Sequence, residues 1–189
     1  MPADLGRTPA GTATTQSALG RALLDVNRAA PEVGARIVAV SPDVSSSTNL
    51  AGYLLRRHAR PAVTICAMGA LVPEALAAAE RLDATGFGTD VICVTGPDLL
   101  FRALQARRGL SGAPEAILDS VFAAGRAAPM VTVLDGHPRT LAFLAGVNQV
   151  PAAHLGVTAF GQSGDIDSTY RYHHIDTDSV IGAALDLVD

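Results

Sequence analysis

Short apolar runs alternate along the chain with longer segments in which apolar residues recur every three or four positions. A short run bounded by Gly, Pro or polar residues is typical of a buried strand, whereas the longer period is typical of a helix. The predicted strands occupy residues 35–40, 62–69, 90–96, 129–136 and 153–161. The predicted helices occupy residues 14–30, 73–82, 97–109, 113–125 and 138–146, and further helical segments surround Tyr170 and Ile181.

The order of these elements predicts an α/β fold, with a mainly parallel sheet and helices on both faces. The pattern also divides the chain into a tail at 1–13, a βα segment at 14–58 and a domain at 61–189. One strand and one helix cannot cover a sheet by themselves, and a lone strand leaves backbone groups unpaired. The 14–58 segment must therefore join the edge of the main sheet, pair with another copy, or remain loosely attached. Of these, we predict pairing with another copy or loose attachment.

Composition narrows the class of protein. Apolar residues make up 49% of the chain and charged residues 17%, which fits a globular interior. The net charge is −4 without a basic cluster, so nucleic acid is not an expected partner. Cys66 and Cys93 lie in apolar runs, as expected in a reducing compartment. Because no apolar run reaches about 18 residues and the N-terminus lacks a leader pattern, we expect a cytoplasmic protein without a membrane span.

Candidate chemistry gathers where the predicted strands end, because ligands of open α/β sheets bind beyond the carboxyl ends of the strands. Gly69, Gly96 and Gly161 stand in such turns, and so do Asp135 and His137. Asp135 and His137 could together transfer a proton. Alternatively, Asp135 could cap the next helix while His137 is only a turn residue. The second interpretation is favoured, because no nucleophile stands nearby.

Residues 160–180 are the most particular stretch of the sequence. Ser163 and Asp165 could each cap the helix that follows, and Ser163 lacks the G-x-S-x-G frame of a hydrolase elbow. His173 and His174, with acids after them, raise the question of a metal site. Adjacent side chains on a helix diverge, so both could not face one ion while the helix persists. We interpret this stretch as the end of a domain, with its polar residues at a surface or interface.

Four segments carry a family resemblance, and they occur in the family's order. They read "TICAMGALVPEALAAAERL", "DVICVTGPDLLFRAL", "MVTVLDGHPRTLAFLAG" and "HLGVTAFGQSGDIDSTYRYHHIDTDSVIGAAL". Residues 61–188 thereby resemble the C-terminal domain of transketolase-like, thiamine-diphosphate-dependent enzymes. The best match is the decarboxylating component of pyruvate dehydrogenase complexes in its single-chain bacterial form. Residues 15–57 resemble the start of the family's pyrimidine-binding domain, and Asp43 falls in a loop that lies near the subunit interface in the family.

The sequence also departs from the family. The remainder of the pyrimidine-binding domain would lie between residues 57 and 61, and with it the acidic residue that activates the cofactor. The metal-ligand motif of the pyrophosphate-binding domain has no counterpart either. The resemblance therefore implies thiamine diphosphate and Mg²⁺ for the complete family, but no cofactor for this chain alone.

We therefore expect a partial transketolase-like protein that is inactive alone. Its C-terminal domain would provide packing and subunit association, and the protein would form a homodimer. Two alternatives stay open: a chain that completes a split thiamine-diphosphate-dependent enzyme, and a regulatory domain that binds a small ligand. No catalytic, cofactor-binding or metal-binding residue is assigned. The candidate ligand or interface residues are Asp43, Asp135, His137, Gly161, Ser163, Asp165 and His173.

Overall fold

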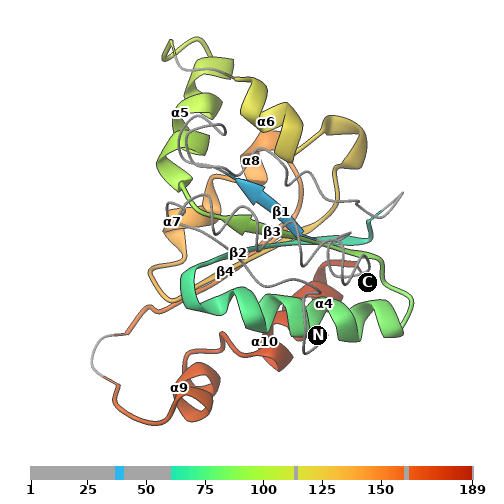
Figure 1. Cartoon of the computed structure of the whole chain (residues 1–189), viewed down its shortest axis with the longest axis vertical. Coiled ribbons are helices and arrows are strands. Elements are labelled where there is room, and N and C mark those ends of the chain that lie inside the picture. The colour runs from blue at the N-terminus through green and yellow to red at the C-terminus, as the bar shows by residue number, and fades with distance from the viewer. Residues whose placement is uncertain (1–36, 41–60, 113–114, 160–161, 189) are drawn as a thin grey trace, which may run out of the picture.

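The computed structural model describes residues 37–40, 61–112, 115–159 and 162–188, which form a layered α/β domain (Figure 1). Its sheet has five strands in the order β1-β3-β2-β4-β5, and every neighbouring pair is parallel. The predicted fold class is thus confirmed. The strands are β1 (Ile37–Val40), β2 (Val63–Met68), β3 (Thr89–Val94), β4 (Met130–Leu134) and β5 (Ala152–Leu155).

The helices fall close to their predicted positions. They are α4 (Val72–Ala84), α5 (Pro97–Arg107), α6 (Ala116–Val121), α7 (Arg139–Ala142), α8 (Ala145–Asn148), α9 (Ile166–Tyr172) and α10 (Thr177–Val188), with 3-10 turns η1 (Gly69–Leu71) and η2 (Ala124–Arg126). The single helix predicted at 138–146 is wrong, because two short helices occupy the region. The second ends at Gln149, whose φ of 54° is left-handed. The helix predicted at 14–30 lies outside the described residues.

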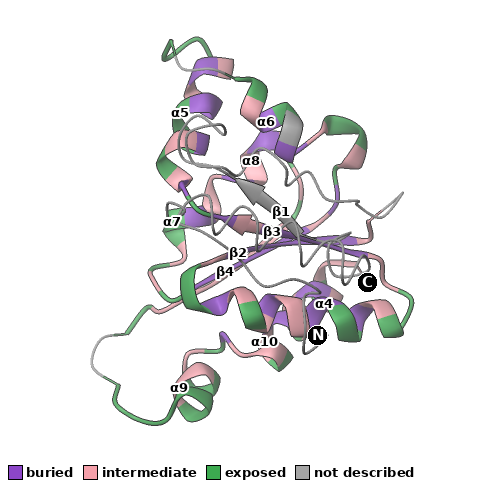
Figure 2. Ribbon diagram, in the orientation of Figure 1, coloured by how far each residue is buried: buried purple, intermediate pink, exposed green. Residues whose placement is uncertain are grey.

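Alternate strand residues supply two separate apolar cores, one on each face of the sheet. On the first face, side chains such as Cys66 and Ile92 pack under α5, α6, α7 and the residues of α8. On the second face, Ile65 and Val131 pack under α4 and α10. Period-two alternation explains this division, because successive strand residues point to opposite sides. Both faces are therefore buried, as is usual for parallel sheets (Figure 2).

The second face is closed mainly by α4 and α10, which lie side by side across the sheet (Figure 1). Ala75, Ala78 and Ala79 of α4 are completely buried, and Ala184 of α10 is buried with them. Small side chains on both helices allow their backbones to approach the sheet closely. Tyr170, Ile175 and Val180 pack against this face. Ile175 and Val180 are fully buried, and the half-buried Tyr170 packs against the same core.

Strand β1 decides how the N-terminal segment is attached. Its residues Ile37–Val40 pair in register with Val91–Val94 of β3, at one edge of the sheet. The prediction that this segment pairs with another copy or stays loosely attached is therefore wrong for this strand, which adds to the edge of the main sheet. The β1 backbone thereby gains a hydrogen-bonded neighbour that a lone strand would lack.

At the amino ends of the strands, one ion pair is largely buried. An Arg126 Nη donates to Oδ2 of Asp90 over 2.7 Å, and Asp90 is only 5% exposed. The pair ties η2 to the start of β3. A cavity of about 20 Å³ beside it has room for one water molecule. None of the helices in the described ranges could cross a bilayer, since the longest, α4, has 13 residues.

Candidate functional site

The turns that follow β2 and β4 touch one another at the carboxyl edge of the sheet. Gly69 has a φ of +66°, and a Cβ added there would lie 2.8 Å from Oδ1 of Asp135. The left-handed backbone and the close carboxylate both require glycine at this position. The sequence therefore identified two turns that the fold brings together.

Asp135 does not cap the helix after it, so that expectation was wrong. The residue at the N-cap of α7 is Pro138, and no side chain makes a capping bond there. Instead, the imidazole of His137 bonds to the start of the helix: its Nδ1 accepts a hydrogen bond from the backbone N–H of Arg139 over 3.2 Å. Asp135 and His137 are both exposed. Nδ1 of His137 is thereby occupied by the backbone, and no contact between its ring and the Asp135 carboxylate holds the two side chains as a pair among the described residues.

The turn after β5 is equally tight, and sequence reasoning missed its main residue, Gly156. A Cβ at Gly156 would lie 2.6 Å from the carbonyl oxygen of Gly136 and 2.9 Å from Pro138. The neighbouring Val157 donates its backbone N–H to that same oxygen over 2.9 Å. The chain thus leaves β5 by passing directly against the turn after β4. The glycine in "HLG" was the available signal for this close approach.

A second residue that sequence reasoning missed is His154 on the edge strand β5. Its Nδ1 lies 2.9 Å from the hydroxyl of Thr132, which stands opposite it on β4 and is fully buried. Burial lowers the pKa of His154, because the charged imidazolium is poorly solvated there. The hydrogen bond satisfies a buried hydroxyl inside the sheet. No sequence signal pointed to it, since the two residues are far apart in the chain.

Asp165, one of the two residues predicted to cap this helix, is the N-cap of α9. Its Oδ1 accepts the backbone N–H of Ser168 over 2.9 Å, and its other carboxylate oxygen accepts the Ser168 hydroxyl. These two bonds, the hydroxyl first, hold the pKa of the Asp165 carboxyl below its usual value. Ser163, the other candidate, is exposed and does not cap the helix.

His173 and His174 lie at the end of α9 and not within it. His173 follows the last helical residue, and His174 has a left-handed φ of 54°. The Tyr172 ring meets the His173 ring edge-to-face, with 5.0 Å between ring centres. Within the described ranges, no group of His, Cys, Asp and Glu side chains is arranged to hold a metal ion. Two other candidates, Asp43 and Gly161, lie outside those ranges.

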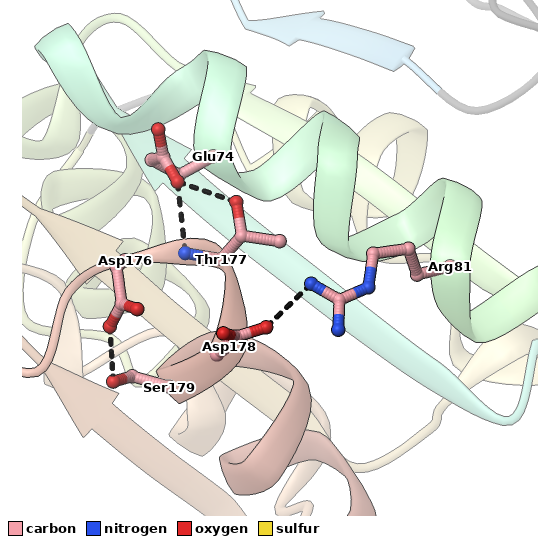
Figure 3. A network of polar contacts seen from close by, with 6 residues as sticks. All are labelled: Glu74, Arg81, Asp176, Thr177, Asp178 and Ser179. Carbon is pink, nitrogen blue, oxygen red and sulfur yellow. Dashed lines mark hydrogen bonds and ion pairs between the residues drawn. The ribbon is translucent and has the colours of Figure 1, made fainter. Parts of the chain in front are cut away.

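The most connected polar site joins α4 to the start of α10 (Figure 3). Oε2 of Glu74 accepts two hydrogen bonds from Thr177, one from the backbone N–H over 2.9 Å and one from the hydroxyl over 2.5 Å. Glu74 therefore caps a helix that begins 103 residues further along the chain. Two turns further along α4, Arg81 pairs with Asp178 over 2.5 Å, with both side chains largely exposed.

An open polar groove runs beside this network, between α4, α9 and α10. Its volume is about 260 Å³, and four carboxylates and two arginines line it together with Tyr170 and Thr177. Most of these groups already bond to one another: Ser179 donates to Asp176, and the backbone oxygen of Asp167 accepts from Nε of Arg171. The bonds of Glu74 and Arg81 fasten α4 to α10, whereas the bond of Arg171 stays within α9. The groove presents no activated nucleophile among the described residues.

The two cysteines do not supply a nucleophile either. Cys66 is fully buried and Cys93 half-buried, and both are free thiols. Burial raises the pKa of each thiol, which leaves little of the reactive thiolate at neutral pH. They stand on neighbouring strands, with Cys66 opposite Ile92 and Cys93 opposite Ala67. Their side chains therefore point to opposite faces of the sheet.

Residues 51–176 match the family model of transketolase-like C-terminal domains. Because the match covers well over half of the chain, the protein belongs to this family, as the sequence resemblance implied. A solved structure described as "Split gene transketolase, inactive beta4 tetramer" also matches, with 19% identity and a TM-score of 0.49. That match covers 70% of this chain and 41% of the other, so the chain corresponds to less than half of that protein. No curated protein matches the chain.

The described residues do not provide a binding site for thiamine diphosphate and Mg²⁺, the cofactors that the family resemblance implies. Cofactor activation in the family needs a carboxylate against the aminopyrimidine ring. Of the glutamates in the described ranges, Glu74 is engaged with Thr177, while Glu80 and Glu115 are exposed. No group of His, Cys, Asp and Glu side chains in these ranges is arranged to hold the Mg²⁺ ion.

Proposed function

We propose that this chain is a partial transketolase-like protein whose main role is subunit association. One observation carries the proposal: the chain matches the family's C-terminal domain over 51–176, yet nothing between residues 57 and 61 can hold the remainder of a pyrimidine-binding domain. In this proposal, residues 61–189 form the C-terminal-type domain, and 14–58 are a partial pyrimidine-domain-like segment after a tail at 1–13.

The sheet supports this division of roles. The strand at 37–40 resembles the first strand of the pyrimidine-binding domain, but it pairs with β3 in the main sheet. It therefore serves as an edge strand of the C-terminal-type domain. A segment that would begin a cofactor-binding sheet in the complete enzyme instead completes the sheet of its neighbour. The parent reaction that we propose is decarboxylation of a 2-oxo acid, as in pyruvate dehydrogenase, or two-carbon ketol transfer.

The test combines cofactor binding with self-association. Isothermal calorimetry of the purified chain with thiamine diphosphate and MgCl₂ should show no heat of binding, and pyruvate should not be decarboxylated. Sedimentation equilibrium should show a concentration-dependent dimer. Micromolar cofactor binding would overturn the inactive role. A monomer at every concentration would overturn the role in self-association.

A second candidate is a chain that completes a split enzyme in trans. The observation that favours it is the missing activating carboxylate, which a thiamine-diphosphate enzyme must obtain from another chain if this one takes part in catalysis. The chain should then co-purify, at its native level of expression, with a protein that retains thiamine diphosphate. Isolation of the chain alone would refute this candidate.

A further inference from the structure

A small cavity lies between η2 and the amino ends of the strands, on the first face of the sheet. Strands β2, β3 and β4 contribute residues to its wall, and so do η2 and α8. Its volume is about 20 Å³, and one water molecule needs about 10–15 Å³ of such space. The described lining is mostly apolar, but it includes the polar side chains of Thr64, Asp90, Arg126 and Asn148. The cavity thus has the volume and the polar groups that a bound water molecule requires.

The guanidinium of Arg126 brings a buried donor to this cavity. One Nη of Arg126 donates to Oδ2 of Asp90 over 2.7 Å. Its Nε is also buried, yet that atom has no hydrogen-bond partner among the described residues. A buried donor on a charged group costs the free energy of its desolvation unless it is bonded, and native structures seldom leave one unpaired. We therefore expect an acceptor within reach of Nε.

Two further polar side chains of the wall can bond to the same water molecule. Thr64 is buried and stands opposite Asp90 on the neighbouring strand, and its hydroxyl can both donate and accept. The amide nitrogen of Asn148 donates to the carbonyl oxygen of Phe122 over 2.9 Å, which leaves the amide oxygen of Asn148 as an acceptor. A buried water molecule makes about three hydrogen bonds, and the Nε donor, the hydroxyl and the amide oxygen supply that number.

Charge and size together favour water over any other ligand. Asp90 and Arg126 are the charged residues of the described lining, and they neutralise one another. An anion would therefore meet the carboxylate of Asp90, and a cation would meet the guanidinium of Arg126. The volume is too small for an organic ligand. A neutral molecule that both accepts and donates hydrogen bonds is required, and water has that chemistry.

We propose that one resident water molecule occupies this cavity, accepts a hydrogen bond from Nε of Arg126, and bonds to the hydroxyl of Thr64 and the amide oxygen of Asn148. The water links η2 to β2 and α8. It also completes the bonding of a buried ion pair, which needs such bonds because its two charges have lost their hydration. The site lies at the end of the sheet opposite to the edge where α/β folds bind substrates, so its role is structural and independent of the proposed function.

A crystal structure of the full chain tests the site directly, without any variant. One ordered water molecule should appear in the cavity, about 2.7–3.2 Å from Nε of Arg126. A cavity without solvent density would overturn the proposal. An Nε that donates directly to a protein oxygen would overturn it as well, because the donor would then need no water.

Magnetic relaxation dispersion of water ¹⁷O tests the site in solution, because it counts the water molecules that remain in a protein for longer than it tumbles. Thr64→Val removes one bonding partner with little change in volume, so the count should fall by one relative to the wild type. Thr132→Val is the matched control, since Thr132 is also buried in a strand, but its hydroxyl bonds to His154 and it does not line the cavity. Circular dichroism confirms that the variants are folded. Equal counts for the wild type and Thr64→Val would overturn the proposed bridge.

Discussion

Replacing Glu74 with alanine removes the carboxylate that fastens α10 to α4. Oε2 of this side chain accepts both the backbone N–H and the hydroxyl of Thr177. That N–H belongs to the first residue of α10, so it has no partner within its own helix. Water would replace the carboxylate only in part, because Glu74 and Thr177 are half-buried. Loss of the contact should therefore destabilise the whole domain, since α10 covers one face of the sheet.

The magnitude follows from the two bonds that are lost. Hydrogen bonds to a charged group contribute about 1.5–3 kcal/mol, and removal of a capping side chain costs about 0.5–2 kcal/mol. Since the site is partly solvated, we expect Glu74→Ala to lower the free energy of unfolding by about 2 kcal/mol. For a domain of this size, that corresponds to a decrease of about 4–8 °C in Tm.

Urea unfolding followed by circular dichroism measures the effect, and α4 supplies its own control. Glu80 lies on the same helix, is exposed, and should change stability by less than about 0.5 kcal/mol when replaced by alanine. Glu74→Gln, which keeps an acceptor oxygen but no charge, should fall between the two. A double-mutant cycle with Thr177→Val isolates the contact, and the coupling should exceed about 0.5 kcal/mol.

A loss for Glu74→Ala no larger than that for Glu80→Ala would refute this reasoning. Additive effects of Glu74→Ala and Thr177→Val would do so as well, because the two side chains would then not interact. Either outcome would mean that the apolar residues beneath α10 hold the helix without the polar contact.

Three further predictions concern buried groups. Gly156→Ala places a Cβ 2.6 Å from the carbonyl oxygen of Gly136, so calorimetry should show a loss of about 1–3 kcal/mol. Because burial lowers the pKa of His154 beside Thr132, the unfolded chain binds a proton first as the pH falls. Its contribution to stability is therefore complete above the unfolded pKa of 6.5 and declines below it, as urea titrations across that range would measure. Burial raises the pKa of Cys66, so thiol reagents should modify it only during opening of the domain.

Each of these predictions has a control in the chain. Gly125→Ala should be close to neutral, because its Cβ would meet no atom within 4 Å, and an equal loss at both glycines would contradict the steric argument. His154→Gln should flatten the dependence on pH, so an unchanged slope would exclude this histidine. The half-buried Cys93 should react faster than Cys66, and the reverse order would contradict the burial argument.

Much of the fold could be predicted because its signals are local. Apolar runs bounded by glycines gave β2, β3 and β4 within two residues at each end. Pro73 and Pro97 marked the beginnings of α4 and α5, where proline's missing N–H has no cost. The division of 138–146 into two helices was not predictable, because each piece has only four residues, far fewer than the stretch over which a helical period can be recognised.

Little of the candidate site could be predicted, because its contacts join distant residues. Asp165 was recognisable as a cap, since its partner Ser168 stands three residues away. Nothing local marked the contact between Glu74 and Thr177. Asp135 was misjudged for the same reason, because its carboxylate lies against the turn at Gly69 and the helix that follows in the chain does not use it as a cap.

By itself, the sequence determined the class of fold, the family and the absence of the activating carboxylate between residues 57 and 61, because these follow from local periodicity and from motifs read in order. The tertiary structure decided that strand 37–40 joins the edge of the main sheet beside β3, and that Glu74 caps a helix far along the chain. It also decided that α9 stands apart from the layers of the domain (Figure 1), with Asp167 and Arg171 lining the groove beside α4 and α10. The physical reason is that backbone propensities act over a few residues, whereas edge pairing, capping across elements and exposure depend on which segments become neighbours when both faces of the sheet are buried.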